Sequence, residues 1–448
     1  MKFKAEKNTL MEAIQSVYNV ISIKTALPIL SHILIEAQQD NIRLTATDLD
    51  VGISCVLPVN ILEQGAITIP AKRFSDIIRE LPSDQVSFTT KKNNLITIET
   101  DSCQFKIMGI AREEFPKLPE FKDKEAITMT QESLKQMLTL TSFAASVDET
   151  RYVLNGILFK IVKNTLTLVA TDGKRLAVIE KKLPAGTDKE VSLIVPIKTI
   201  HELNRSLEDE GELSILLGNN QVLFDLGNII IISRLIEGEF PDYRQVIPAV
   251  SESKVQINRT QLLLAVKRAA LLATPDYQAV KFEIFKNKLV ISKSTPDVGE
   301  SREEIGISYQ GREMVIGLNP HYIIDVLKNL DKEEIDLEVT DSEKPGVMLD
   351  LGCGSGRHAR HFAELGWSVV GYDISAEMVA LAKETVPAEL ADRLEFAVGD
   401  ARSLSASRRF DAVVSLFHVV SYQTTQADLE AMIANAARHL RPGGRFVF

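Results

Sequence analysis

Apolar residues recur at helical spacing in three segments that lie far apart in the sequence, and each segment opens with a short strand-like run. The segments run from residue 3 to 21, from 127 to 144 and from 255 to 273. One helical face of the first carries Leu10, Ala13, Ile14, Val17 and Ile21, a stripe typical of a helix packed on a core. The leucines at positions 10, 134 and 262 set a period of 124 to 128 residues.

A second amphipathic helix follows in each segment at the same period. The apolar stripes of these helices are Phe74/Ile77/Ile78/Leu81, Ile200/Leu203/Leu207 and Ile323/Val326/Leu327/Leu330. Alternating, strand-like runs lie between the two helices, for instance at residues 33–35, 42–46, 166–170 and 288–291. A period of this length suits a whole domain and is too long for a solenoid unit. The pattern therefore predicts an α+β fold of three tandem, strand-rich domains.

The composition of the chain changes near residue 346. Before Val347 there are 28 lysines and 13 arginines, whereas one lysine and nine arginines follow. Folding physics does not demand this change, since lysine and arginine serve similarly on an exposed surface. The joint at residues 344–347 also has no Gly/Ser-rich or Pro-rich linker. We expect domains at 1–122, 123–250, 251–346 and 347–448, and an artificial or mis-assembled join stays open.

Composition and charge exclude several classes of protein. The 448 residues are 45% apolar and 25% charged, and no apolar run approaches the roughly 18 residues that a membrane-spanning helix needs. The charged N-terminus lacks the apolar core of a signal peptide. Cys55, Cys103 and Cys353 are far apart, without a C-x-x-C pair. These features predict a reduced, cytoplasmic protein without a membrane partner. The formal charge of −10 disfavours wholesale coating of nucleic acid but permits a local basic surface.

Basic residues recur on the solvent faces of the predicted helices. They are Lys72, Arg73, Arg79, Lys198, Arg205 and Lys267. Acidic residues are interleaved with them, so each helix alone reads as an ordinary solvated face. Because the basic face recurs in successive domains, however, side-by-side helices would offer phosphates a sequence-independent, salt-sensitive contact.

Six longer motifs make residues 1–346 resemble the bacterial sliding clamp family, the beta subunit of DNA polymerase III. They are Thr-Ala-Leu-Pro-Ile-Leu (25–30), Leu-Thr-Ala-Thr-Asp-Leu-Asp (44–50), Ile-Pro-Ala-Lys-Arg-Phe (69–74), Arg-Tyr-Val-Leu-Asn-Gly-Ile-Leu-Phe (151–159), Val-Ala-Thr-Asp-Gly-Lys-Arg-Leu-Ala-Val (169–178) and Glu-Phe-Pro-Asp-Tyr-Arg (239–244). The resemblance implies three clamp domains per chain and a homodimeric ring around double-stranded DNA, without sequence preference. Such a ring is a processivity factor in DNA replication and not itself catalytic.

The same resemblance implies particular site residues. DNA contacts fall on Lys24, Arg151 and Tyr152, and the ring-closing contact falls on Phe105 of one chain and Leu271/Leu272 of its partner. A pocket for short peptides of the replicative polymerase, clamp loader and repair proteins falls on Leu154, Thr171, Gly173, Lys174, Arg175, Leu176, Pro241, Val246, Asn319 and Tyr322. The chain departs from the family after Gly346, where the last clamp strand is expected, so one pocket wall and a sheet edge are in question.

Residues 347–448 carry a different pattern. A strand from Val347 runs into Gly352-x-Gly354-x-Gly356, a helix follows from about 357 to 365, and the next strand ends at Asp373. Glycines allow close approach of a ligand to the backbone, and an acid on the second strand can accept both ribose hydroxyls. Arg357 stands where the dinucleotide fingerprint has its last glycine, and Asp350 before the glycines can meet an amino-acid ammonium.

These motifs, with Gly399-Asp400 and Arg441-Pro-Gly-Gly, resemble a class I S-adenosylmethionine-dependent methyltransferase of partial Rossmann-like α/β fold. The resemblance implies a cofactor site of Asp350, Gly352, Gly354, Gly356, Asp373, Asp400 and Ala401 for S-adenosyl-L-methionine. We expect the domain to be truncated at both ends. His358 and His361 are expected to be surface residues and not metal ligands, since no third ligand is in view.

Three functional hypotheses follow. The first is a DNA sliding clamp whose final strand is replaced by part of a methyltransferase fold. The second is a methyltransferase that residues 1–346 tether to DNA, and the third is a chimaera with neither activity. We expect the strand at 347–351 to stay in its own sheet rather than to complete the third clamp domain.

Overall fold

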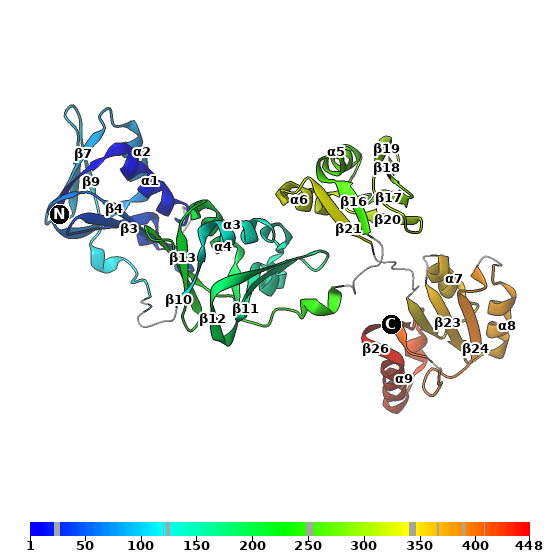
Figure 1. Ribbon diagram of the computed structural model, residues 1–448. Helices are drawn as coiled ribbons and strands as arrows, with labels where there is room; N and C mark the ends of the chain where they lie inside the picture. Colours follow the sequence, from blue (N-terminus) through cyan, green and yellow to red (C-terminus); the bar gives the residue numbers. More distant parts are fainter. Residues whose placement is uncertain are drawn as a thin grey trace. The chain divides into compact units, whose positions relative to one another are not determined.

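Three similar modules of strands and paired helices follow one another along the first part of the chain (Figure 1). The computed structural model describes residues 1–21, 27–119, 121, 126–247, 254–339, 346–364, 367–387, 390–406 and 408–448. It forms two compact units, one of residues 1–250 with 255–337 and the other of residues 251–254 with 338–448. We call the modules repeats one, two and three, and the part from Val347 onward the C-terminal segment.

Each repeat begins with a strand and a helix, as the apolar periodicity predicts. Repeat one contains β1 (Lys2–Glu6), α1 (Lys7–Tyr18), β2 (His32–Gln38), β3 (Asn41–Thr47), β4 (Val51–Pro58), β5 (Asn60–Glu63), β6 (Gly65–Pro70), α2 (Ala71–Glu80), β7 (Gln85–Thr90), β8 (Leu95–Glu99) and β9 (Gln104–Met108). Repeat two contains β10 (Ala126–Thr130), α3 (Gln131–Thr139), β11 (Gly156–Thr171), β12 (Leu176–Pro196), α4 (Ile197–Ser206), β13 (Glu212–Leu217), β14 (Gln221–Asp225) and β15 (Ile229–Arg234). Repeat three contains β16 (Lys254–Asn258), α5 (Arg259–Ala270), β17 (Val280–Phe285), β18 (Lys288–Thr295), β19 (Gly299–Gly306), β20 (Met314–Leu318), α6 (Pro320–Asn329) and β21 (Glu334–Glu338).

The order of strands in the sheets shows which elements are equivalent. The run β4-β3-β2-β6 in repeat one corresponds to the four-stranded sheet β19-β18-β17-β20 in repeat three. The run β1-β7-β8-β9 in repeat one corresponds to β10-β13-β14-β15 in repeat two. The long strands β11 and β12 pair with each other along most of their length and take the place of β2, β3, β4 and β6. The predicted triplication is therefore confirmed at the level of topology.

Repeats one and two share one continuous sheet. The last strand of repeat two, β15, pairs antiparallel with β4 of repeat one, with Ile231 opposite Ile53. The result is the eight-stranded order β10-β13-β14-β15-β4-β3-β2-β6. Both pairing residues are fully buried, so backbone hydrogen bonds and apolar burial together hold this junction.

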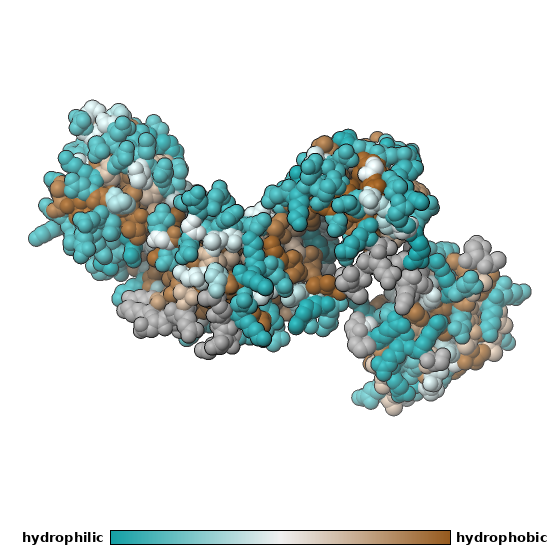
Figure 2. All heavy atoms as spheres, viewed as in Figure 1, coloured by the Kyte–Doolittle hydropathy of each residue, from teal (hydrophilic) through white to brown (hydrophobic). Residues whose placement is uncertain are grey.

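The second helices of repeats one and two bury most of their apolar stripes, as their sequences predict. Phe74 on α2 and Ile200 on α4 are both 0% exposed, and burial of a large side chain of this kind contributes about 1.5–3 kcal/mol. Hydrophilic residues cover most of the surface visible in Figure 2, with smaller hydrophobic patches between them. Among the described residues, no helix is long and apolar enough to cross a membrane.

Repeat three differs from the other two after its second helix. In the described part of the chain a single strand, β21, follows α6, whereas three strands follow α2 and α4. The hairpins β8–β9 and β14–β15 span residues 95–108 and 221–234, while only residues 339–346 separate β21 from the next strand. The sequence predicts the loss of one strand at this place. The comparison between repeats shows that the described part of repeat three has no counterpart of the whole two-stranded hairpin.

The C-terminal segment forms a five-stranded sheet in the order β24-β23-β22-β25-β26, with every pair parallel. Its elements are β22 (Val347–Leu351), α7 (Arg357–Glu364), β23 (Ser368–Asp373), α8 (Ala376–Glu384), β24 (Leu394–Val398), β25 (Phe410–Val414), α9 (Gln426–His439) and β26 (Leu440–Val447). The strand order reverses between β22 and β25, where open parallel sheets place their ligands. This is the Rossmann-like topology that the glycine motif predicts. Strand β22 is central in its own sheet, as expected, and does not complete repeat three.

Equivalent apolar residues on β13 and β21 should differ in their contribution to stability. Ile215 on β13 is 1% exposed, whereas its counterpart Leu337 is half-buried. We expect Ile215→Ala to cost about 2–5 kcal/mol and Leu337→Ala to cost clearly less, since its side chain leaves less of a cavity. Hydrogen exchange in a urea series, read by mass spectrometry, would measure each repeat separately. An equal or larger cost at Leu337 would contradict the account.

Candidate functional site

The basic residues predicted on the helices are all exposed, but they differ in their partners. Lys72 and Arg73 on α2 and Lys267 on α5 have no ion pair among the described residues. The Arg79 guanidinium lies 3.5 Å from the Asp76 carboxylate. These side chains are therefore available to an external anion to different degrees, because a local carboxylate already neutralises some of them.

The two basic residues of α4 are the most strongly held. The Arg205 guanidinium lies 2.8 Å from the carboxylate of Glu202, and burial raises the pKa of Glu202. The Lys198 ammonium pairs with Asp48, in the turn between β3 and β4. Lys198 therefore ties repeat two to repeat one, a role that its sequence position did not indicate.

Arg151 and Tyr152 lie exposed in a short 3₁₀ segment before β11. The Arg151 guanidinium donates to the Asp172 carbonyl at 3.3 Å and would lie 2.7 Å from a Cβ placed on Gly173. A side chain predicted to contact DNA thus adjoins the turn predicted to bind peptides. The predicted contact at Lys24 lies outside the described residues.

The turn between β11 and β12 brings several predicted pocket residues together. Gly173 has φ +83°, a conformation that favours glycine. The Thr171 hydroxyl donates to the Arg175 carbonyl at 2.6 Å, and the Asp172 carboxylate accepts from the backbone N–H groups of Lys174 and Arg175 at 2.9 and 3.0 Å. The loop is therefore held by its own side chains, which leaves Lys174 exposed.

Arg175 links this turn to helix α6. Its guanidinium donates to Asp172 at 3.1 Å and to Asp325 at 2.7 Å. It also lies 4.6 Å from the ring centroid of Tyr322, within the range of a cation–π contact. Two predicted pocket residues, Arg175 and Tyr322, thus touch each other, and Asp325 is a partner that the sequence reasoning missed. Because Asp325 lies 150 residues from Arg175 in the sequence, no local spacing indicated this pair.

An apolar cluster forms a further wall beside the turn. Leu176 packs with Val153, Ile236, Phe240 and Tyr243 against three buried residues: Leu158, Val169 and Ile194. Only Leu176 of this cluster was predicted, because the other members lie on segments far apart in the sequence. Such a wall beside a few charged groups suits a peptide that carries an apolar side chain.

The remaining predicted pocket residues are Leu154, Pro241, Val246 and Asn319. Leu154 is buried, while Pro241, before the 3₁₀ segment Tyr243–Val246, and Val246, at its end, are exposed. Asn319 caps α6 by accepting from the His321 N–H at 3.0 Å. Its amide also donates to Gln278 at 3.0 Å.

The predicted ring-closing residues lie near open sheet edges. Phe105 is on β9, the last strand in the order β5-β1-β7-β8-β9, and is 38% exposed. Leu271 follows α5 and is 80% exposed, whereas Leu272 is half-buried. Strand β19 of the same repeat is also an edge strand. Since β15 and β4 are the counterparts of β9 and β19, the chain itself contains one example of the pairing that these edges can make.

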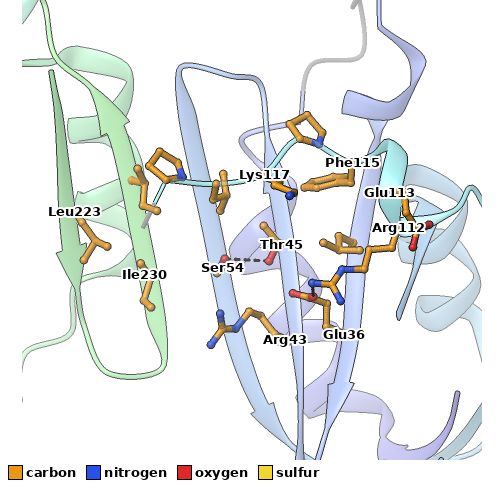
Figure 3. Close-up of a pocket in the computed structure, with 15 residues that line it drawn as sticks. Glu36, Arg43, Thr45, Ser54, Arg112, Glu113, Phe115, Lys117, Leu223 and Ile230 are labelled. Carbon is orange, nitrogen blue, oxygen red and sulfur yellow. Dashed lines mark hydrogen bonds and ion pairs between the residues drawn. The ribbon is translucent and has the colours of Figure 1, made fainter. Parts of the chain in front are cut away.

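A cavity of about 680 Å³ lies beneath the segment from Arg112 to Pro119 (Figure 3). The segment crosses β2, β3 and β4 toward Leu223 and Ile230 (Figure 3). Arg112 pairs with Glu36 at 2.8 Å, and a Cβ on Gly52 would lie 2.7 Å from Leu118. The segment is thus held on the face of the sheet formed by β2, β3 and β4 through Arg112 and Leu118. No predicted site residue is among the described residues that line the cavity.

The glycine turn of the C-terminal segment has the geometry of a ligand-binding loop. Gly352, Gly354 and Gly356 have φ of +80°, +53° and +76°. The Asp373 carboxylate accepts from the Gly354 N–H at 2.8 Å and from the Ser375 N–H at 2.9 Å. Asp373 therefore anchors the turn, and a Cβ on Gly354 would meet nothing within 4 Å. The open space above Gly354 is where a ligand can approach the backbone.

Asp350 is a buried acid without a hydrogen-bond partner on Oδ2 in the described structure. It is 1% exposed, and burial, followed by repulsion from Asp373, raises its pKa to about 7. A buried carboxyl of this kind is costly unless a partner satisfies it. An ammonium group on a ligand is one chemically suitable partner.

The predicted adenine-side residues have partners of their own. The Arg402 guanidinium donates to the Asp400 carboxylate at 2.5 Å and to Asp428 at 2.7 Å, and these hydrogen bonds hold the pKa of Asp400 below its usual value. The Ala401 carbonyl accepts from the amide of the buried Asn435 at 3.0 Å. Asn435 was missed because only the folded chain brings α9 beside this loop, whereas the position of Arg402 directly after Ala401 was an available signal.

The stability of the C-terminal segment should fall as the pH rises. The native pKa of Asp350, about 7, lies above the unfolded value of roughly 3.9, so the native state retains the proton longer. The contribution of Asp350 to stability is fully present below pH ~4 and is lost toward pH 7, by an amount on the order of 4 kcal/mol. Trp367 is the only tryptophan and packs on this core, so its fluorescence reports unfolding here. Asp350→Asn should abolish most of the slope, and an unchanged slope in that variant would contradict the assignment.

Comparisons with known proteins agree with both parts of the structure. The sequence profiles for the DNA polymerase III beta subunit match as N-terminal domain at residues 1–119, central domain at 128–242 and C-terminal domain at 244–352. A methyltransferase domain profile matches residues 348–444. The last two profiles overlap on β22, which the structure assigns to the parallel sheet.

Relatives and solved structures cover most of the chain. A beta sliding clamp of Chlamydia pneumoniae is 34% identical over 354 residues, 79% of this chain and 97% of the relative. That of Bacillus subtilis is 33% identical over 360 residues, 78% of this chain and 95% of the relative. The crystal structure of a Bacillus subtilis clamp has a TM-score of 0.73 at 32% identity, covering 76% of this chain and 93% of that structure. A Pseudomonas aeruginosa beta subunit gives 0.73 at 31%, covering 76% and 94%. On these grounds the chain belongs to the beta sliding clamp family.

Proposed function

We propose that the chain acts as a processivity factor that encircles duplex DNA and retains the replicative polymerase on its template. The observation that carries this proposal is that helices of two repeats present exposed basic residues without an ion pair among the described residues. These are Lys72 and Arg73 on the second helix of repeat one, α2, and Lys267 on the first helix of repeat three, α5. Residues 1–346 carry a net charge of −8 (41 basic against 49 acidic). The basic helical face therefore contrasts with an acidic remainder.

A few phosphate contacts without base contacts are suitable for sliding. Phosphate contacts carry no sequence information, and their strength falls with salt because binding releases counterions. The ion pairs at Arg205 and Lys198 limit the positive charge of α4. Retention then depends on closure of the ring rather than on affinity.

Two copies would close the ring through their open sheet edges. Strand β9 of one copy and β19 of the other are the counterparts of the β15–β4 pair inside the chain. Phe105 and Leu271 supply exposed apolar surface near these edges. The proposed assembly is a homodimer.

Polymerase, clamp loader and repair proteins would bind through short peptides at the turn of residues 171–176. Arg175 and the exposed Lys174 supply positive charge beside the apolar wall around Leu176. An apolar peptide side chain would contact that wall, and the charged groups would fix its orientation.

Retention on DNA is the direct test of the clamp. We expect the full chain to remain on nicked circular DNA and to leave after linearisation. Charge reversal at Lys72, Arg73 and Lys267 to Glu should lower the salt slope by about 0.9 per lost phosphate contact. Lys91→Glu with Lys92→Glu, exposed in the β7–β8 turn, is the matched control. Equal loss from circular and linear DNA would count against the proposal.

A second function is favoured by the glycine turn, namely binding of S-adenosyl-L-methionine by the C-terminal segment. Two features fit the amino-acid end of S-adenosyl-L-methionine, namely the Asp350 Oδ2 without a hydrogen-bond partner in the described structure and the open space at Gly354. Gly352 and Gly354 would hold the methionine part, Asp373 the ribose, and Asp400 with Ala401 the adenine, while Gly356 completes the glycine turn. When bound, this cofactor supplies a methyl group on a sulfonium.

Calorimetric titration of the full chain with S-adenosyl-L-methionine tests this second function. We expect measurable heat, and Asp373→Asn should weaken binding about tenfold or more because a charged acceptor for the ribose is lost. Glu384→Gln, exposed on α8, should bind like the unaltered chain. No heat at millimolar cofactor would exclude the function.

A further inference from the structure

The three repeats allow the same positions to be compared in one chain. In each repeat, the residue that follows the first strand donates its backbone N–H to the carbonyl of the residue that precedes β7, β13 or β21. The three hydrogen bonds join Lys7 to Asp84, Gln131 to Gly211 and Arg259 to Glu333. This hydrogen bond aligns β21 with β7 and β13 residue by residue. Ile335 corresponds to Val86 and Leu213, and Leu337 corresponds to Phe88 and Ile215.

Four apolar positions are less buried in repeat three than in its siblings. Val86, Phe88, Leu213 and Ile215 are at most 1% exposed, whereas Ile335 and Leu337 are half-buried. On the second helix Phe74 and Ile200 are 0% exposed and Leu81 and Leu207 are 2% and 3% exposed, whereas their counterparts Ile323 and Leu330 are half-buried. The side chains are apolar in all three repeats, so the difference lies in what covers them.

What covers these positions in repeats one and two is a two-stranded antiparallel hairpin. Strand β8 pairs with β7, with Phe88 opposite Ile98, and β14 pairs with β13, with Ile215 opposite Phe224. Among the described residues β21 pairs only with β16. In the described structure, the edge of β21 at residues 335–337 has no strand partner besides β16 and lies beside a half-buried apolar face, which is the arrangement to which an added strand binds.

The occupant is a hairpin rather than a single strand, because the second strand also has a place. In repeat two that strand, β15, continues to β4 of the preceding repeat. The counterpart of β4 in repeat two is the first part of β12, residues 176–182, which pairs with β11 only. A hairpin on β21 can thus pair with β12 through its second strand.

Charge decides between a second copy of this chain and a different polypeptide. The outward residues of β21 include Glu334 and Asp336, where β7 has Gln85 and Ser87 and β13 has Glu212 and Ser214. Asp336 is therefore the acid that neither sibling strand has. Two β21 strands paired antiparallel would place acids opposite acids, which is destabilising. A strand with basic outward residues and apolar inward residues is complementary.

We propose that β21 of repeat three accepts a β-hairpin from a separate polypeptide, whose first strand carries apolar residues facing Ile335 and Leu337 and basic residues facing Asp336. The hairpin completes the half-buried apolar face of repeat three and pairs with residues 176–182 of β12.

The probe is a synthetic hairpin with the sequence of residues 221–234, in which Leu223→Lys and Asp225→Lys make the outward positions basic. By the register of β13 and β14, position 225 lies opposite Asp336. The matched peptide carries Leu223→Glu and keeps Asp225. We expect the full chain to prefer the basic hairpin by about threefold or more. Hydrogen exchange should show new protection at β21 and at residues 176–182 together.

Variants of the chain keep the proposal falsifiable. Asp336→Lys should reverse the preference toward the acidic hairpin, while Asp331→Lys, exposed outside the strand, should leave it unchanged. Leu337→Asp should abolish binding of both. Equal binding of the two hairpins, protection elsewhere, or self-association of the chain through β21 would each overturn the proposal.

Discussion

The architecture depends on one interaction between repeats. The last strand of one repeat pairs antiparallel with β4, or with the counterpart of β4, in another repeat. The β15–β4 ladder turns two modules into one eight-stranded sheet and buries apolar side chains from both. The same rule assigns partners to two further edges, β9 with β19 of a second copy and the uncovered β12 with a hairpin that repeat three lacks. Our proposals for ring closure and for the hairpin site of repeat three both rest on this one rule.

The sequence allowed some features to be predicted and not others. Helical stripes such as Leu10/Ala13/Ile14/Val17 are local, so their periodicity located α1 and its counterparts. The glycine turn and Asp373 were likewise found from adjacent residues. In contrast, the Lys198–Asp48 pair spans 150 residues, and Asn435 reaches Ala401 from α9. Contacts of this kind depend on tertiary folding and leave no local pattern.

The join near residue 346 brings two incompatible sheet systems together. Strand β22 is taken up by parallel partners on both sides, so it cannot also pair antiparallel within repeat three. As a result, Ile335 and Leu337 stay half-buried, even though the apolar pattern of β21 matches that of β7 and β13, whose equivalent residues are buried. Both folds are recognisable in one chain, but only the C-terminal sheet gains a strand from the shared segment.

Hydrogen exchange at β9 and β19, measured as a function of protein concentration, tests the pairing rule most directly. The account predicts that the amides of both edges gain protection together as the concentration rises, and that Phe105→Asp removes the gain at both. Protection that does not depend on concentration, or that changes at one edge alone, would contradict it.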